Sequence, residues 1–271
     1  MRDAKDVGSM QPILWFTICL AAAVISPLRP VAARVPQCGA TIFADVTLDD
    51  DLVCAATAIV VGADGVTVDL NGHSVTGSGV GEGVLVSGRT AITVKNGTIA
   101  NFESGVRILD SADVTIKDVT LTANTDGVDC AAGCISSTFK DSEFSGNRAR
   151  GVMLRGLSNE ITVKDNRFTG NRVGVLLFGC SGCTVKDNVV SYSLLAGVRF
   201  SVTATDNHVK DNTVSGSPAG IEFLITPTGS AIGNAITGNS LSTNACGLKG
   251  PLSGNVVRKN TFSGNVANVC Q

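Results

Sequence analysis

Aromatic residues and charged residues are both scarce in this sequence. Aromatics make up 4% of the 271 residues, with one tryptophan and one tyrosine, so a surface of aromatic platforms that stack on neutral sugars is not expected. Charged residues make up 16% and the formal net charge is -2, which excludes the basic stripe typical of nucleic-acid-binding proteins. The hydrophobic share of 44% is too high for a disordered chain, and abundant valine, isoleucine and threonine favour β-strands.

Long hydrophobic runs are also rare. Ile13–Ile25 is an uncharged run of 13 residues, which is shorter than the about 20 residues that a membrane-spanning helix needs. Small residues follow it, and Val31–Ala33 offers a cleavage point, so residues 1–33 are predicted to be an export signal. An uncleaved anchor is the alternative. Cleavage places the mature chain outside the cytoplasm, secreted or periplasmic, without further membrane contact.

The cysteines agree with export. Cys19 lies in the predicted signal, and the remaining eight form an even number, which is typical of disulfides in exported proteins. A zinc site built from two close pairs is the alternative, but an oxidising compartment favours disulfides, and no metal ligand is predicted. The connectivity stays open at this point, and the spacing favours four local pairs: Cys38 with Cys54, Cys130 with Cys134, Cys180 with Cys183, and Cys246 with Cys270.

A repeat runs through most of the chain. A glycine followed by an aliphatic residue recurs at intervals of 22 to 27 residues, and two asparagine-rich columns keep step with it, which indicates a solenoid. The glycines are Gly83, Gly105, Gly127, Gly151, Gly174, Gly197, Gly220 and Gly247. One column holds Asn71, Asn96, Val119, Ser142, Asn166, Asn188, Asn212, Asn234 and Asn260, and the other holds Asn101, Asn124, Asn147, Asn171, Asn239 and Asn265.

The apolar residues within each repeat alternate, as in Val66, Val68 and Leu70, which is the spacing of strands and not of helices. We therefore predict an all-β, single-stranded right-handed parallel β-helix of about nine coils. Residues 34–65 are expected to form an N-terminal cap with the first coil, and residues 66–271 the repeats. Asparagines are expected at bends with a left-handed backbone and bonded to one another, and the repeated glycines at tight corners.

The segment Cys38–Gly77 resembles the first coils of secreted bacterial β-helix proteins with carbohydrate-binding and sugar-hydrolase repeats. More broadly, residues 38–271 resemble the right-handed parallel β-helix proteins of the pectin-lyase-like superfamily. The resemblance is specific for the fold and weak for activity, because one fold hosts many chemistries. Members of the superfamily that are enzymes work on polysaccharides with outward side chains from neighbouring coils.

One short match points to hydrolysis. Asn124–Asp129, NTDGVD, resembles the first motif of polygalacturonases, which would make Asp126 the catalytic acid. The paired aspartates and the His-Gly motif expected one and two coils later are missing, because Asn147–Val152 reads NRARGV and Asn171–Leu176 reads NRVGVL. The polygalacturonase assignment is therefore not favoured, and an asparagine ladder with a turn explains the match as well.

Four charged residues near the repeated glycines are the remaining catalytic candidates. Arg107 and Asp129 fall on adjacent rungs, as do Asp126 and Arg150. One interpretation is cross-rung ion pairs on a solvated face, each contributing about 0–1 kcal/mol. The other is a lyase groove in which Asp126 and Asp129 hold Ca²⁺ and Arg150 or Arg107 is the base. The first is favoured, because no tight group of carboxylates supplies the oxygens that calcium needs.

Two classes of function remain open from the sequence. The favoured one is a non-catalytic scaffold or adhesion module that binds an extracellular carbohydrate polymer, without a cofactor. The alternative is a lyase or hydrolase that acts on a uronic-acid polymer, with Ca²⁺ as the cofactor of a lyase. Whether the chain is an enzyme is not decided by the sequence, and a polysaccharide is the expected partner in both cases.

Overall fold

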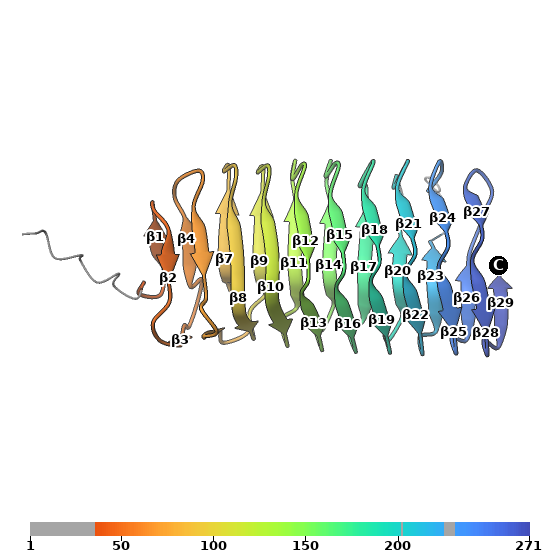
Figure 1. The fold of residues 1–271 in the computed structure, drawn as a ribbon, viewed down its shortest axis with the longest axis horizontal. Helices are drawn as coiled ribbons and strands as arrows, with labels where there is room; N and C mark the ends of the chain where they lie inside the picture. Colours follow the sequence, from red (N-terminus) through yellow and green to blue (C-terminus); the bar gives the residue numbers. More distant parts are fainter. Residues whose placement is uncertain (1–35, 202, 225–230) are drawn as a thin grey trace, which may run out of the picture. The chain divides into compact units, whose positions relative to one another are not determined.

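The computed structural model describes residues 36–201, 203–224 and 231–271, so the predicted export signal lies outside the described residues. Every regular element in the described part of the chain is a β-strand. Within those residues no helix has the length and hydropathy of a membrane span. The predicted parallel β-helix is confirmed: successive coils stack along one axis, and all strand pairs are parallel (Figure 1).

One long sheet, here called sheet A, contains one strand from every coil. It has eleven strands, which makes ten turns from first to last and agrees with the predicted number of about nine coils. Its strands, in spatial order, are β1 (Ala40–Ile42), β4 (Ile59–Val61), β7 (Glu82–Ser87), β9 (Ser104–Leu109), β11 (Asp126–Ala131), β14 (Arg150–Arg155), β17 (Val173–Phe178), β20 (Ala196–Phe200), β23 (Ala219–Phe223), β26 (Cys246–Lys249) and β29 (Ala267–Cys270).

The other strands form two rows, which β8 and β10 join because each of these long strands runs through both; together they are called sheet B. The first row is β2 (Val46–Thr47), β5 (Thr67–Asp69), β8 (Thr93–Ala100), β10 (Thr115–Thr122), β12 (Thr138–Lys140), β15 (Thr162–Lys164), β18 (Thr184–Lys186), β21 (His208–Lys210), β24 (Ala235–Thr237) and β27 (Val256–Arg258). The second row adds β3 (Leu52–Val53), β6 (Ser74–Thr76), β13 (Glu143–Ser145), β16 (Arg167–Thr169), β19 (Val189–Ser191), β22 (Thr213–Ser215), β25 (Ser240–Ser242) and β28 (Thr261–Ser263).

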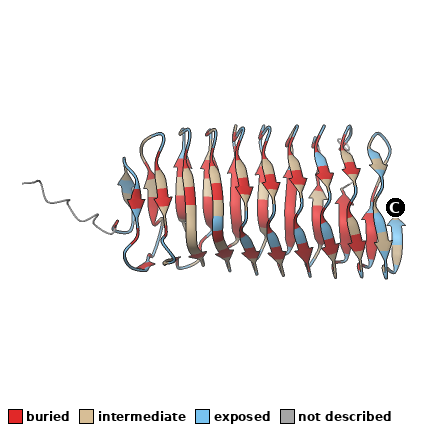
Figure 2. Ribbon diagram, in the orientation of Figure 1, coloured by how far each residue is buried: buried red, intermediate tan, exposed pale blue. Residues whose placement is uncertain are grey.

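The core is a set of stacked columns, because equivalent residues of successive coils lie opposite one another. Strands of sheet B mostly alternate between buried and less buried residues, as in Thr138–Lys140, whereas several strands of sheet A are buried throughout, and buried segments recur in successive coils (Figure 2). Two pairs of phenylalanine rings stack across coils, Phe144 on Phe168 at 4.6 Å and Phe200 on Phe223 at 4.5 Å. The clearest column in sheet A is Val84, Val106, Val128, Val152, Val175, Val198, Ile221 and Leu248.

The repeated glycines next to this column have a reason different from the one expected. They lie within strands of sheet A and do not have a positive φ, so the expectation of a tight corner is wrong. A Cβ atom at Gly127 would lie 2.5 Å from the carbonyl oxygen of Gly151, and one at Gly151 would lie 2.7 Å from that of Gly174. Glycine is therefore required because successive coils pack too closely for any side chain.

The asparagines form three ladders, which are buried except on the last coil, and their side chains join adjacent coils. Asn166 donates its backbone N–H to Oδ1 of Asn188 at 3.0 Å, and its Nδ2 donates to the carbonyl oxygen of Phe139 at 2.9 Å. These bonds satisfy backbone groups that a bend would otherwise leave unpaired. The first ladder contains Asn166, Asn188, Asn212, Asn239 and Asn260, the second Asn124, Asn147 and Asn171 and then Asn244 and Asn265, and the third Asn207, Asn234 and Asn255.

Two parts of the column assignment from the sequence are corrected. Asn239, and not Asn234, follows Asn212, because the coil between β21 and β24 has 27 residues and shifts the count. Asn71, Asn96 and Asn101 have φ values of 50°, 61° and 62°, so they occupy left-handed corners one position before the ladders. Later corners equivalent to that of Asn96 hold mostly aspartates, and those equivalent to that of Asn101 hold mostly glycines, whereas the ladder asparagines do not have a left-handed backbone.

Four disulfides join the cysteine pairs that the spacing favours. Cys38–Cys54 closes the first coil and Cys246–Cys270 links β26 to β29, so each end of the stack has a covalent link. Cys130–Cys134 and Cys180–Cys183 lie in the middle coils. All eight cysteines of the described residues are in disulfides, so none of these eight is a thiolate ligand for zinc.

Candidate functional site

The predicted charged residues lie on the outer face of sheet A, on three neighbouring strands. Asp126 on β11 is opposite Arg150 on β14, and Asp129 is opposite Arg107 on β9. Nε and Nη2 of Arg150 donate to Oδ1 and Oδ2 of Asp126, both at 2.6 Å. The side chain of Asp126 is only 8% exposed, so the structure brings this pair together as a nearly buried, bidentate ion pair.

Asp129 has a partner that the sequence did not reveal. Arg155, at the end of β14, donates its Nε and Nη2 to the two carboxylate oxygens of Asp129 at 2.9 and 2.8 Å. Arg107 lies farther away, with its Nε 3.9 Å from Asp129 and its Nη1 3.6 Å from Glu82. The hydrogen bond to Asp129 raises the pKa of Arg155 above its usual value. The alternation along β14 would have placed Arg155 on the outer face, two residues after Met153.

These contacts limit what the four candidates can do chemically. Each of the two carboxylates uses both oxygens on a guanidinium, so neither presents a free oxygen pair to a metal ion or a substrate proton. Among the described residues there is no group of three or more histidine, cysteine, aspartate or glutamate side chains placed to hold a metal ion. The geometry matches the cross-rung ion pairs considered above, and a catalytic role of Asp126, Asp129, Arg150 and Arg107 stays a prediction.

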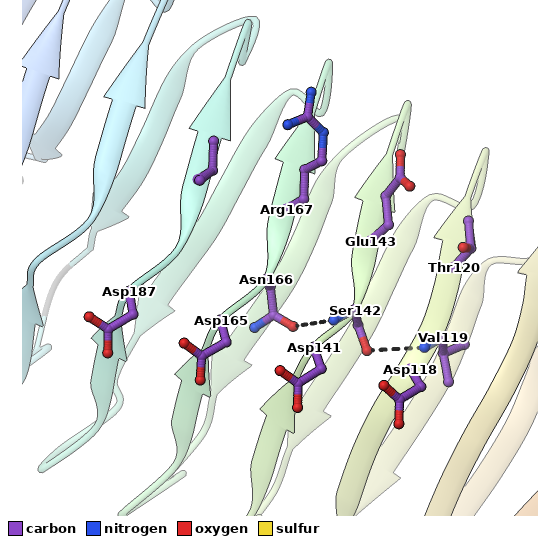
Figure 3. A pocket seen from close by; sticks show the side chains of 11 residues that line it. Asp118, Val119, Thr120, Asp141, Ser142, Glu143, Asp165, Asn166, Arg167 and Asp187 are labelled. Carbon is purple, nitrogen blue, oxygen red and sulfur yellow. Dashed lines mark hydrogen bonds between the residues drawn. The ribbon is translucent and has the colours of Figure 1, made fainter.

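A groove crosses four coils on the outside of sheet B, and we call it the aspartate groove (Figure 3). It has a volume of about 590 Å³ and lies beside the bend between the two strand rows. Glu143 and Arg167 stand along one side, and the backbone below is held by ladder bonds such as that from Ser142 N–H to Asn166 Oδ1 at 3.0 Å. The four exposed aspartates after which it is named are Asp118, Asp141, Asp165 and Asp187.

A row of lysines runs beside this groove in the same register. Lys140, Lys164 and Lys186 each lie close to the aspartate that follows them, at 3.2, 3.5 and 3.4 Å. The lysines are about one-third exposed, so the pairs are accessible to a ligand. The full row is Lys95, Lys117, Lys140, Lys164, Lys186 and Lys210.

The aspartates beside the lysines owe their position to the backbone. Asp118, Asp141, Asp165 and Asp187 have φ values of 55°, 50°, 56° and 56°, a left-handed conformation that aspartate tolerates better than most residues. Each corner directs its carboxylate away from the core while the next residue enters the ladder. This row is not among the residues next to the repeated glycines, although the repeated Lys-Asp pair is visible in the sequence.

The strand pairing defines the class of protein: a parallel β-helix with polar surfaces repeated along the stack. A family model described as "Periplasmic copper-binding protein (NosD)" matches residues 63–249, and the chain belongs to this family. No curated protein matches the sequence.

Solved structures share the fold at low sequence identity. The alginate lyase from Paenibacillus sp. str. FPU-7 is 12% identical, with a TM-score of 0.68 over 84% of this chain and 90% of that chain. A mutant tailspike protein of E. coli bacteriophage HK620, in complex with a pentasaccharide, is 13% identical, with a TM-score of 0.63 over 82% of this chain and 50% of that chain. At these identities the likeness concerns the fold alone.

The copper of the family description does not fit the described residues. Copper sites in proteins use thiolate, thioether and imidazole ligands. All eight cysteines of the described part are in disulfides, and Met153 is the single methionine there. His73 and His208 lie on different coils, with His73 3.3 Å from Asp51. These donors do not converge on one point.

Proposed function

We propose that the protein is a secreted or periplasmic, non-catalytic scaffold that binds a carbohydrate polymer along the aspartate groove. The proposal is carried by one observation: the same Lys-Asp pair recurs in register on consecutive coils beside an open groove. A polymer that lies along the stack meets this pair at every rung, about 4.8 Å apart.

The chemistry of the pair suits hydroxyl-rich ligands. A carboxylate accepts hydrogen bonds from sugar hydroxyls, and the neighbouring ammonium donates to hydroxyl or ring oxygens. Each contact is weak because the groups are exposed, but linked contacts on successive coils add through effective concentration. The scarcity of aromatics is consistent with this mode, since the only tyrosine, Tyr192, is exposed but does not line the groove.

A binding measurement tests the proposal. The mature chain, residues 34–271, is run by affinity electrophoresis in gels that contain individual neutral and acidic polysaccharides. We expect retardation by at least one polymer, weakened severalfold by the double substitution Asp141→Asn and Asp165→Asn. Asparagine keeps the left-handed backbone, so the fold is preserved.

A matched control uses aspartates from other corners. Asp113 and Asp206 are exposed and have φ values of 55° and 56°, but they lie outside the groove. The double substitution Asp113→Asn and Asp206→Asn removes the same charge and is expected to leave retardation unchanged. An equal loss of retardation in both double variants would show that binding depends on net charge. It would contradict the groove as the binding site.

The second candidate function is a uronan lyase on sheet A, with Asp126, Asp129, Arg150 and Arg107 as its groups. It is favoured by a single observation, the mixed charges on three consecutive strands. The test follows the ultraviolet absorbance of unsaturated products from pectate and alginate, with and without Ca²⁺. We expect no turnover; turnover that disappears in Asp126→Ala or Arg150→Ala would establish the lyase instead.

A further inference from the structure

A second hollow lies on the outer face of sheet A, away from the aspartate groove. We call it the arginine pocket. It has a volume of about 140 Å³ and spans β14, β17 and β20. Three arginines line it, Arg150, Arg172 and Arg199, and its apolar lining comes from Val173, Leu176 and Leu195.

Two of the three arginines are held in place from outside the pocket. Arg150 is bound by Asp126 on the coil before, as described above. Arg199 donates its Nε to Oε2 of Glu222 on the coil after, at 2.6 Å. Both carboxylates are nearly buried, with side chains 8% and 6% exposed, so the two guanidinium groups are fixed on opposite sides of β17.

Positive charge exceeds negative charge around the pocket. Glu222 also binds Lys249, whose Nζ is 3.0 Å from Oε1, so one carboxylate serves two cations. Arg172 is exposed and makes no ion pair with any residue of the described part of the chain. The three pocket arginines and Lys249 are thus balanced by two carboxylates, so this group of linked side chains has an excess of two positive charges.

The floor of the pocket is apolar although it belongs to an outer face. Val173 and Leu176 are 4% and 9% exposed, and their register partners on the neighbouring strands include Arg150 and Arg199. A guanidinium beside an apolar floor favours a ligand that combines an anionic group with a compact apolar surface, since a planar arginine binds an oxyanion bidentately. The volume is too small for a polymer segment and suits one acidic unit.

We infer that the arginine pocket binds an oxyanion, carboxylate or sulfate, carried on a compact frame with an apolar face. Arg172, which is exposed and has no ion-pair partner in the described part of the chain, supplies the guanidinium that binds the anion, and Arg150 and Arg199 add positive charge held in place by Asp126 and Glu222. The ligand is either a free small acid or one acidic unit of a longer chain. The inference does not depend on the aspartate groove, which lies on sheet B.

Calorimetric titration of the mature chain tests the inference with glucuronate, glucose, acetate, sulfate and a glucuronate-containing oligosaccharide. We expect glucuronate to bind and glucose to show no heat of binding at the same concentrations. Arg172→Gln is expected to lower the affinity for glucuronate at least tenfold. The substitution should not disturb the fold, because the side chain is exposed and has no ion-pair partner in the described part of the chain. Arg258→Gln, an exposed arginine on β27 outside the pocket, is the matched control and is expected to keep wild-type affinity.

A second variant isolates the apolar floor. Leu176→Ser is expected to lower the affinity for glucuronate severalfold. The affinity for sulfate should stay the same, because sulfate has no apolar face. Stronger binding of the oligosaccharide than of glucuronate assigns the site to a polymer, and equal binding assigns it to a free acid. Equal affinity of Arg172→Gln and Arg258→Gln, or a response to glucose equal to that to glucuronate, overturns the inference.

Discussion

Asp129 and Arg155 are joined by two parallel hydrogen bonds although they are not opposite each other in the sheet. The register partner of Asp129 on β14 is Met153, and Arg155 reaches back diagonally by two residues to the buried carboxylate. Arg107, which is the register partner of Asp129 on the other side, is 3.9 Å away. The carboxylate is therefore neutralised mainly by a residue that strand pairing alone does not identify.

This ion pair gives a stability prediction. Arg155→Met is expected to lower the free energy of unfolding by about 1–3 kcal/mol, because it leaves a nearly buried carboxylate without its main partner. The double variant Asp129→Leu with Arg155→Met is expected to recover part of this loss, since no unpaired charge remains. Urea unfolding of the four proteins of the cycle measures both; a double variant as unstable as the sum of the single ones would contradict the account.

The asparagine ladders predict a dependence on position along the stack. Oδ1 of Asn171 accepts from the backbone N–H and from Nδ2 of Asn147, at 3.0 and 2.8 Å, and its own Nδ2 donates to Phe144 O at 2.8 Å. Asn171→Ala is expected to cost about 2–4 kcal/mol of unfolding free energy, because these buried groups lose their partners. Asn265→Ala, on the last coil and partly exposed, is expected to cost less than half as much in the same urea titration.

The close packing of the glycines predicts another contrast. Gly151→Ala is expected to destabilise the protein by about 1–3 kcal/mol, because the added methyl group meets the backbone of the next coil and the ring of Phe168. Gly170→Ala has open space around the new Cβ but a φ of 66°, so its cost is limited to about 1–2 kcal/mol of backbone strain. Crystal structures or amide exchange would locate the difference: the first variant should loosen the neighbouring coils, and the second only its own corner.

A pH-dependent contribution is expected at the first coils. Partial burial raises the pKa of Asp69, but the backbone N–H of Asn71 and the side chains of Lys95 and Asn96 outweigh it, so the pKa is lowered. A carboxyl with a lowered folded-state pKa stabilises the protein above its unfolded pKa, near 3.8, and this stabilisation is lost as the pH falls through the folded pKa. The window therefore lies at and below about pH 4.

The variant Asp69→Asn checks this sign. It keeps an acceptor for the amide of Asn71 but loses the ion pair with Lys95, which is 3.1 Å away. At pH 7 we expect it to be less stable than wild type by about 0.5–1 kcal/mol, with the difference disappearing as the pH falls below the folded-state pKa. A difference that is constant between pH 7 and pH 2.5 would exclude titration of Asp69 as its source.

The sequence predicts the stack well because every coil repeats the same inward positions. The valines after the glycines fall into one core column directly from their spacing, and the cysteine pairs follow from their closeness in the chain. The asparagine assignment fails where counting assumes a uniform coil. The 27-residue coil displaces Asn234 and Asn239 by one ladder, and hydrogen bonds to the next coil, which a sequence does not contain, decide the assignment.

The contacts on the charged faces are harder to predict from the sequence, for a different reason. Spacing places Asp126 opposite Arg150 correctly, because both belong to the same column. It does not reveal that Arg155 reaches diagonally to Asp129, since that depends on side-chain length and not on register. The arginine pocket is missed as well, because its lining residues come from three different coils.

The asparagine ladders also determine how a protein of this kind can change in length. The side-chain oxygen of a ladder asparagine accepts from the backbone of the coil before it, and its own N–H groups donate to the equivalent oxygen of the coil after it, so a coil does not distinguish between neighbours. Duplication of one whole coil restores the ladder hydrogen bonds at both of its boundaries. Insertion of half a coil into a strand interrupts all the ladders at that point. The number of coils is therefore free to vary in whole steps, and the reach of the protein along a ligand grows by about 4.8 Å with each duplication.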